Sequence, residues 1–145
     1  MNAIAAYLFV FAGGAVGALT RLGVQEGCRK WTSLPGWGAI FIVNILGSFC
    51  IGLAVAWLMG LESNFRFDGN NPLHRYVETQ AAEHALSLLA VGFCGAFTTF
   101  STFSLDNHFL YQNQRGRMAF NMVGSAVIAL LAVLAGWQLG TWAAA

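Results

Sequence analysis

The sequence contains very little charge: only 9% of its 145 residues are Asp, Glu, Lys or Arg, whereas soluble domains average about 25%. Hydrophobic residues make up 57% of the chain. Four stretches carry no charged residue at all, namely residues 1–20, 31–61, 84–105 and 118–145. Each is long enough to cross a bilayer as a helix, which needs about 20 residues. This composition excludes a soluble enzyme, a nucleic-acid-binding protein and a disordered tail, and it predicts a small polytopic membrane protein.

Other shortages exclude further classes of site. The net charge is only +1 and the sequence has no basic tract, so neither an acidic partner nor a phosphate-binding run is expected. The three cysteines, Cys28, Cys50 and Cys94, form no CxxC or Cys/His spacing, which argues against a zinc site and a disulfide framework. Cys50 and Cys94 are expected to be small buried hydrophobes. The N-terminus lacks the basic region of a signal peptide, so the first apolar stretch is expected to remain as a helix.

The apolar stretches predict an all-α membrane protein in which residues 1–145 form a single four-helix transmembrane domain. Gly13 and Gly17 have the small-xxx-small spacing that lets helix backbones approach closely. A polar segment separates the second and third helices, and its Asp68–Pro72 run is a strong turn signal. We therefore expect transmembrane helices at about residues 4–22, 35–59, 84–104 and 118–142, with a polar loop at 62–83.

The third helix is expected to be broken near its middle. Its second half is rich in Gly, Thr and Phe, and both Gly and Thr lower helix propensity. A break between Gly95 and Thr99 would present the N-terminus of the second half-helix to an anion. It would also free backbone carbonyls for a cation.

The positive charges give little indication of orientation. The loops after the first and third helices carry five Lys or Arg residues, and the loop after the second carries Arg66 and Arg75. The positive-inside rule would then place both termini outside. If Arg21 lies in the membrane, the loops after the first and third helices carry four basic residues. If the terminal amine is counted, the other side of the membrane carries three positive charges. A chain with so nearly balanced a count is expected to insert both ways round.

Two polar residues lie within or beside apolar stretches. Asn44 is well inside the second predicted helix, where it would either join two helices through its amide or donate an N–H to a permeating anion. Arg21, at the end of the first predicted helix, would either extend to lipid headgroups or sit in an aqueous vestibule and concentrate anions.

The apolar stretches contain no carboxylate, and Asp106 is expected only at the exit of the third helix. This disfavours a proton- or cation-coupled transporter, which needs a carboxylate within the membrane. It also disfavours a hydrolase, because no base at membrane depth could activate a serine. Phe100 and Phe103 share one helix face. They form either a packing stripe or a pair of rings whose positive edges meet a small anion. A lining of neutral donors and aromatic rings suits an anion.

Three segments together resemble the Fluc/CrcB family of fluoride channels. The run from Gly92 to Ser104 is the most specific of them, and the likeness spans all four predicted helices. A departure is Asp106, which stands where the family often has a glutamate. The segments are Gly13-Gly14-Ala15-Val16-Gly17-Ala18 followed by Arg21, then Asn44-Ile45-Leu46-Gly47-Ser48-Phe49, then Gly92-Phe93-Cys94-Gly95-Ala96-Phe97-Thr98-Thr99-Phe100-Ser101-Thr102-Phe103-Ser104.

The resemblance implies an antiparallel, dual-topology homodimer with two fluoride pores in a bacterial inner membrane. It also implies a structural, untransported Na⁺ held by the backbone carbonyls of Gly95 and Thr98. By the same likeness, the fluoride pore would be formed by Asn44, Phe100, Phe103, Arg21 and, on the fourth helix, Ser125. The expected function is passive export of F⁻ from the cytoplasm, without enzyme activity.

The sequence is also compatible with two other functions. One is a small four-helix proton-coupled exporter, which would require a membrane carboxylate. The other is a non-transporting assembly subunit, in which Asn44 and the glycines serve only for packing.

Overall fold

The computed structural model describes residues 3–66 and 80–144, and within these ranges the chain is helical without β-strands. Residues 80–86 form an α-helix that leads directly into the π-helix. In chain order the elements are α1 (Ala3–Trp31), α2 (Gly36–Arg66), the π-helix η1 (Ser87–Cys94), α4 (Gly95–Phe97), α5 (Phe100–Asn113) and α6 (Arg115–Ala144).

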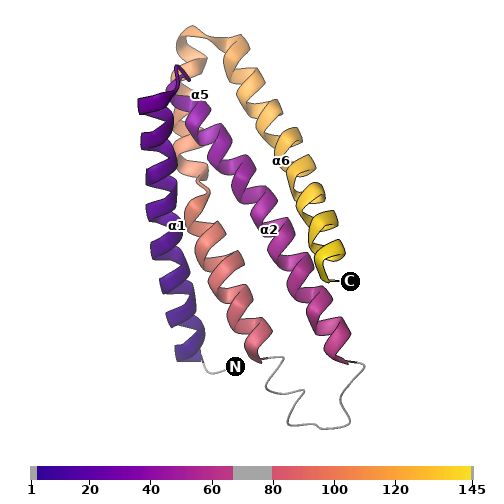
Figure 1. Ribbon diagram of the computed structural model, residues 1–145. Coiled ribbons are helices and arrows are strands. Elements are labelled where there is room, and N and C mark those ends of the chain that lie inside the picture. The colour runs from indigo at the N-terminus through magenta and orange to yellow at the C-terminus, as the bar shows by residue number, and fades with distance from the viewer. Residues whose placement is uncertain (1–2, 67–79, 145) are drawn as a thin grey trace.

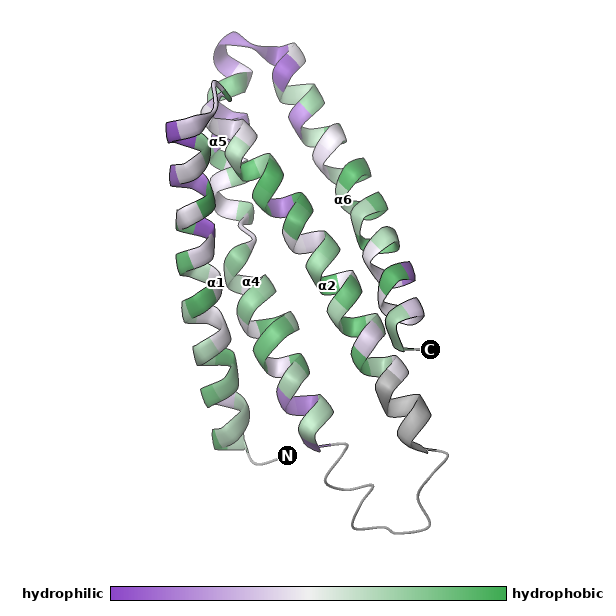
Figure 2. Cartoon of the chain, viewed as in Figure 1, coloured by the Kyte–Doolittle hydropathy of each residue, from purple (hydrophilic) through white to green (hydrophobic). Residues whose placement is uncertain are grey.

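The helices run alternately up and down, so the N-terminal end of α1 and the C-terminal end of α6 lie toward the same end of the molecule (Figure 1). Within the described residues, four helical spans are long and apolar enough to cross a membrane, and the third comprises Gln80–Asn113. Hydrophobic residues cover most of the length of the bundle, and hydrophilic ones gather toward its ends (Figure 2). This is the pattern expected of a polytopic membrane protein.

Glycines allow the helices to approach closely in two places. A Cβ atom at Gly13 or Gly17 would overlap the carbonyl oxygen of Leu88 or Phe93, so these glycines let α1 lie against the backbone of η1. On the other side of the bundle, α2 packs mainly against α6. There, a Cβ atom at Gly140 would come within 2.6 Å of the Leu53 carbonyl oxygen. Small residues are what bring helix backbones together in membranes.

The first helix is longer than predicted. We expected it to end near residue 22 with a turn at 25–27, but α1 continues to Trp31. Glu26 and Arg29 are one turn apart and form an ion pair of 2.6 Å, and basic residues in a last turn favour a helix C-terminus. The turn prediction was wrong because these polar residues belong to a helical extension.

The other predicted helix ends were also too short. The second helix continues to Arg66 rather than ending near 59, and the last occupies 115–144 rather than 118–142. The third was expected at 84–104 but occupies 80–113, so the predicted polar loop at 62–83 is helical at both ends. Hydropathy locates the part of a helix that lies in the bilayer, and these polar turns lie beyond it. The Asp68–Pro72 turn falls outside the described residues.

Candidate functional site

Two residues in the third span have extended backbone. Thr98 has φ −79° and ψ 159°, and Thr99 has φ −148° and ψ 123°. The Thr98 backbone N–H and hydroxyl both donate to the carbonyl of Cys94, at 3.0 and 2.9 Å. The Thr99 hydroxyl accepts a hydrogen bond from the N–H of Thr102 at 3.3 Å, as an N-cap residue does. The two threonines thus end α4 and begin α5.

Asn44 on α2 holds this extended segment in place. Its side-chain oxygen accepts from the Thr99 N–H at 2.9 Å, and its amide nitrogen donates to the Thr99 carbonyl at 3.2 Å. Backbone groups inside a membrane need internal partners. A single side chain therefore satisfies both polar groups of a residue that has left the helix. The sequence left open whether Asn44 joins helices or serves an anion, and the structure places it between two spans.

These hydrogen bonds redirect two N–H groups from their helical acceptors. In a continuous α-helix, the N–H of Thr99 would donate to the carbonyl of Gly95, and that of Thr102 to the carbonyl of Thr98. Here the first donates to Asn44 and the second to the Thr99 hydroxyl. The carbonyls of Gly95 and Thr98 therefore lose the donors that a continuous helix would supply.

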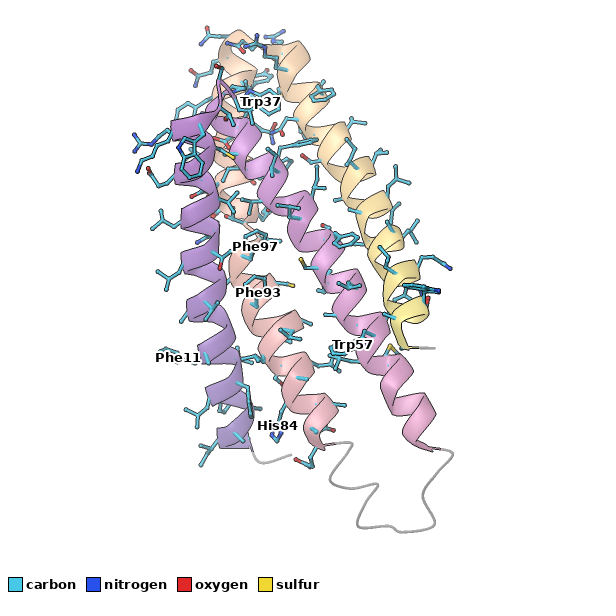
Figure 3. All side chains as sticks on the ribbon, in the orientation of Figure 1. Phe11, Trp37, Trp57, His84, Phe93 and Phe97 are labelled. Atoms are coloured by element: carbon cyan, nitrogen blue, oxygen red, sulfur yellow. The ribbon has the colours of Figure 1, made fainter. Side chains whose placement is uncertain are left out.

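Side chains around the extended segment are closely packed. A Cβ atom at Gly47, one turn after Asn44, would overlap the Thr98 methyl group and approach Phe97 Cδ1 to 3.2 Å. Phe97 is 4% exposed, and its ring stacks on that of Phe93 with centroids 5.5 Å apart. Both rings lie near mid-height of the bundle (Figure 3). The interruption is therefore built into the core.

An open cavity of about 430 Å³ lies beside the interruption, between α2, α5 and α6. Its lining contains hydroxyl, amide and aromatic groups but no charged side chain. Gly95 and Arg21 are absent from it. The lining residues are Asn44, Ser48, Thr98, Thr99, Phe100, Phe103, Met122, Ser125, Ala126 and Ala129. Five of the seven residues predicted to bind fluoride or sodium thus meet at one cavity.

The two phenylalanines of α5 lie together at this cavity. Their ring centroids are 5.9 Å apart and the ring planes are inclined by 38°. Phe100 is 79% exposed, and Phe103 is half-buried. Phe100 therefore does not serve to fill the core of this chain.

A chain of amides extends from the cavity. The Ser125 hydroxyl donates to Asn121 Oδ1 at 3.4 Å, and Asn121 Nδ2 donates to Asn107 Oδ1 at 3.1 Å. Asn107 Nδ2 in turn donates to the carbonyl of Phe103 at 2.9 Å. Asn121 is 1% exposed. These bonds connect α6 to the turn of α5 that carries a cavity phenylalanine.

The remaining predicted residues lie elsewhere. Arg21 is half-buried on α1, and Gly95 is exposed on α4. Asp106 lies within α5 rather than at the exit of the third helix, and lines a second cavity of about 350 Å³ together with Thr102, Glu26 and Arg29. Of the two cysteines expected to be buried, Cys94 is buried and Cys50 is half-buried.

Sequence reasoning missed several polar residues of the site. Ser48 lines the cavity four residues after Asn44, and Asn121 lies four residues before Ser125. Residues four apart share a helix face, so two polar residues at this spacing within an apolar helix could have been recognised. Asn107 carried no such signal because its partner is on another helix.

Comparison with known proteins gives a consistent family match. The family model described as "CrcB-like protein, Camphor Resistance (CrcB)" matches residues 8–137. A protein of Nitrobacter winogradskyi, named "Fluoride-specific ion channel FluC", is 39% identical over 137 residues, covering 91% of this chain and 92% of its own length.

Two further relatives carry the same name. The protein of Hydrogenovibrio crunogenus is 36% identical over 131 residues, covering 90% of this chain and 83% of its own length. The protein of Vibrio vulnificus strain YJ016 is 35% identical over 143 residues, covering 96% and 98%. The similarity therefore extends over all four spans.

Proposed function

This chain belongs to the CrcB family of membrane proteins, and from that membership we propose that it is a fluoride channel. It is an ion channel rather than an enzyme, and a multi-pass protein of the bacterial inner membrane. Its relatives are named fluoride-specific. Fluoride would move passively down its electrochemical gradient, and would leave the cytoplasm when it accumulates there.

The uncharged cavity is the observation that carries this proposal. Its lining combines amide and hydroxyl groups with two phenylalanine rings. A small anion needs hydrogen-bond donors to replace its water. A fixed positive charge would hold it too tightly, because conduction requires binding weak enough for release. Ring edges, which carry the positive end of the quadrupole, add weak attraction.

Asn44 can serve the extended segment and the anion together. An amide group has two N–H donors, and one of them is directed to the Thr99 carbonyl. The other is available to an ion in the cavity that Asn44 lines. Because Thr99 fixes the amide from both sides, this donor is held in one orientation. Phe100, Phe103 and Ser125 complete the proposed pore.

The cavity also supports assembly of the channel as an antiparallel homodimer. It is open on one side, and Phe100 is 79% exposed. A second copy of the chain facing this opening would enclose the ion between subunits. Two such copies inserted in opposite directions would form two pores. Arg21, which does not line the cavity, would act at a distance by attracting anions to a vestibule.

The interruption fits a structural Na⁺ at the centre of such a dimer. Unwound carbonyls are the groups that coordinate Na⁺ in broken membrane helices. Gly95 and Thr98 are the two residues whose carbonyls lose their helical donors to Asn44 and to the Thr99 hydroxyl. A bound Na⁺ would interact with these two carbonyl oxygens in place of the missing N–H donors.

The proton-coupled exporter is less well supported. Its carrier would have to be a membrane carboxylate, and the carboxylate of α5, Asp106, lines the second cavity rather than the one with Asn44. The names of the relatives also favour a channel.

The decisive experiment is ion efflux from proteoliposomes containing purified protein and Na⁺. We expect rapid fluoride release, followed with an ion-selective electrode, and retention of chloride. The rate should follow a membrane potential set with valinomycin and should not require a pH gradient. Comparable loss of chloride would contradict fluoride selectivity, and dependence on a pH gradient would support the exporter.

A further inference from the structure

One end of the bundle carries cations contributed by two separate parts of the chain. The C-terminus of α1 and the connection from α5 to α6 lie at the same end (Figure 1). Arg29 and Lys30 form the last turn of α1, and Arg115 and Arg117 are exposed in the first turn of α6. Both segments are hydrophilic in Figure 2.

The length of α1 places its cations beyond the hydrocarbon. Its 29 residues extend about 43 Å at about 1.5 Å per residue, whereas the hydrocarbon core is about 30 Å thick. If residues 3–22 cross the core, residues 23–31 project by about 13 Å. This brings Lys30 to the level of the lipid headgroups. Trp31, which is 86% exposed, has the amphipathic ring that is enriched at this level.

Within the described part of the chain, the salt bridge at this end joins Arg29 to Glu26. The other three cations form no salt bridge with the described residues. Arg115 instead lies over the Tyr111 ring, with its guanidinium carbon 5.2 Å from the ring centroid. Arg117 donates to the side-chain oxygen of Gln114 at 2.7 Å. Both contacts orient a guanidinium without removing its charge.

The position of the two arginines on α6 calls for a counter-anion. The first turn of a helix favours anions, because backbone N–H groups and the macrodipole make it positive. This turn contains no acidic residue. A phosphate at this level would compensate both guanidinium groups, and guanidinium recognises phosphate through paired hydrogen bonds.

We propose that Lys30, Arg115 and Arg117 form a binding surface for the headgroups of anionic phospholipids, with Trp31 and Tyr111 at the interface. The proposal does not depend on fluoride conduction. Each basic residue near an anionic membrane surface contributes about 1 kcal/mol, or about fivefold in lipid affinity. The attraction is long-range and decreases with salt.

The test compares the affinity of the reconstituted protein for spin-labelled phosphatidylglycerol and phosphatidylcholine by electron paramagnetic resonance. At low salt we expect the native chain to prefer phosphatidylglycerol at least about fivefold, the contribution of one basic residue. The K30Q/R115Q/R117Q variant should show a ratio near one, and added KCl should lower the native ratio. A variant that retains the native preference would overturn the proposal.

A control locates the effect at this end of the bundle. R66Q/R75Q removes two cations from the segment between the second and third spans and should leave the preference intact. An equal loss in this control would show that charge anywhere on the chain suffices, which would overturn the assignment. Inorganic phosphate at constant ionic strength should not abolish the preference, because a free-phosphate site would contradict a lipid surface. Size-exclusion profiles establish that every variant is folded.

Discussion

Asn44 and Thr99, 55 positions apart in the sequence, are joined by two reciprocal hydrogen bonds of 2.9 and 3.2 Å. The Asn44 side chain thereby replaces the helical hydrogen-bond partners of the Thr99 backbone. An interrupted helix at membrane depth is possible only where such partners exist. Asn44, the proposed pore donor, is thus also the residue whose hydrogen bonds stabilise the interruption.

Replacing Asn44 should therefore affect both stability and conduction. Asn44→Ala leaves the N–H and carbonyl of Thr99 unpaired, and we expect a loss of about 1–3 kcal/mol in unfolding free energy. Fluoride efflux should fall with it. Unfolding in detergent and efflux from liposomes measure the two effects. Thr20→Val is a suitable control, because its hydroxyl donates to Val16 O of the same helix on an exposed face. A fully stable Asn44→Ala protein would disprove the proposed stabilising role of the amide.

The cavity phenylalanines should matter for ion flux more than for folding. We expect Phe100→Ile and Phe103→Ile to reduce fluoride efflux about tenfold, equivalent to about 1.4 kcal/mol in barrier height, because the ring edges are lost. Cross-linking should still detect the dimer. Phe109→Ile is the matched control, since Phe109 is 59% exposed on the same helix and does not line the cavity. Undiminished flux in both cavity variants would remove the rings from the mechanism.

The buried amides should be energetically coupled. Asn107 and Asn121 bond across helices at 3.1 Å, and interhelical hydrogen bonds in membrane proteins contribute about 0.6–1.7 kcal/mol. A double-mutant cycle with Asn107→Ala and Asn121→Ala should give a coupling energy in this range. The cycle is measured from unfolding free energies in detergent. Additive effects would show that the two amides act independently.

Gly13 should not tolerate a larger residue. In Gly13→Ala the new methyl group would overlap the Leu88 carbonyl, so α1 and η1 must move apart. We expect a destabilisation of about 1–3 kcal/mol, measured as a lower thermal midpoint in detergent. Gly23→Ala is the control on the same helix, because a Cβ there meets nothing within 4 Å. Equal midpoints for the two variants would show that α1 is not held by this contact.

Removing Na⁺ should impair the channel if Gly95 and Thr98 hold it. Replacing Na⁺ by N-methylglucamine during purification should reduce fluoride efflux or the dimer fraction, because two carbonyls would lack a partner. Returning Na⁺ should restore both. Asn44→Ala should alter the Na⁺ dependence, since it removes the side chain that holds the extended segment beside these carbonyls. Activity indifferent to Na⁺ would count against this site.

Much of the fold was predictable from the distribution of charge. Stretches without charge must lie in the hydrocarbon, so four spans follow from the sequence. The helix ends were missed because polar residues can continue a helix outside the bilayer, as Glu26 and Arg29 do through their ion pair. The π-helical conformation of residues 87–94 has no signal in hydropathy.

The candidate site was only partly predictable. Asn44, Phe100 and Phe103 stand out because polar groups and paired rings within apolar helices are unusual, and the structure places all three at one cavity. Their roles in conduction remain predictions. Asn107 could not be identified, because nothing in its own helix indicates that its amide meets Asn121.

The sequence by itself determined that this chain resides in a membrane, since four stretches without charge are each long enough to cross the hydrocarbon core whatever they contact. Only the tertiary structure decided which polar groups meet, because hydrogen bonds require atoms within about 3 Å. Because the net charge is +1 and the sequence has no basic tract, neither an acidic partner nor a phosphate-binding run was expected. Folding nevertheless brings Lys30 and Arg115 to one end of the bundle. Basic residues that are distant in the sequence therefore contribute to one positively charged surface.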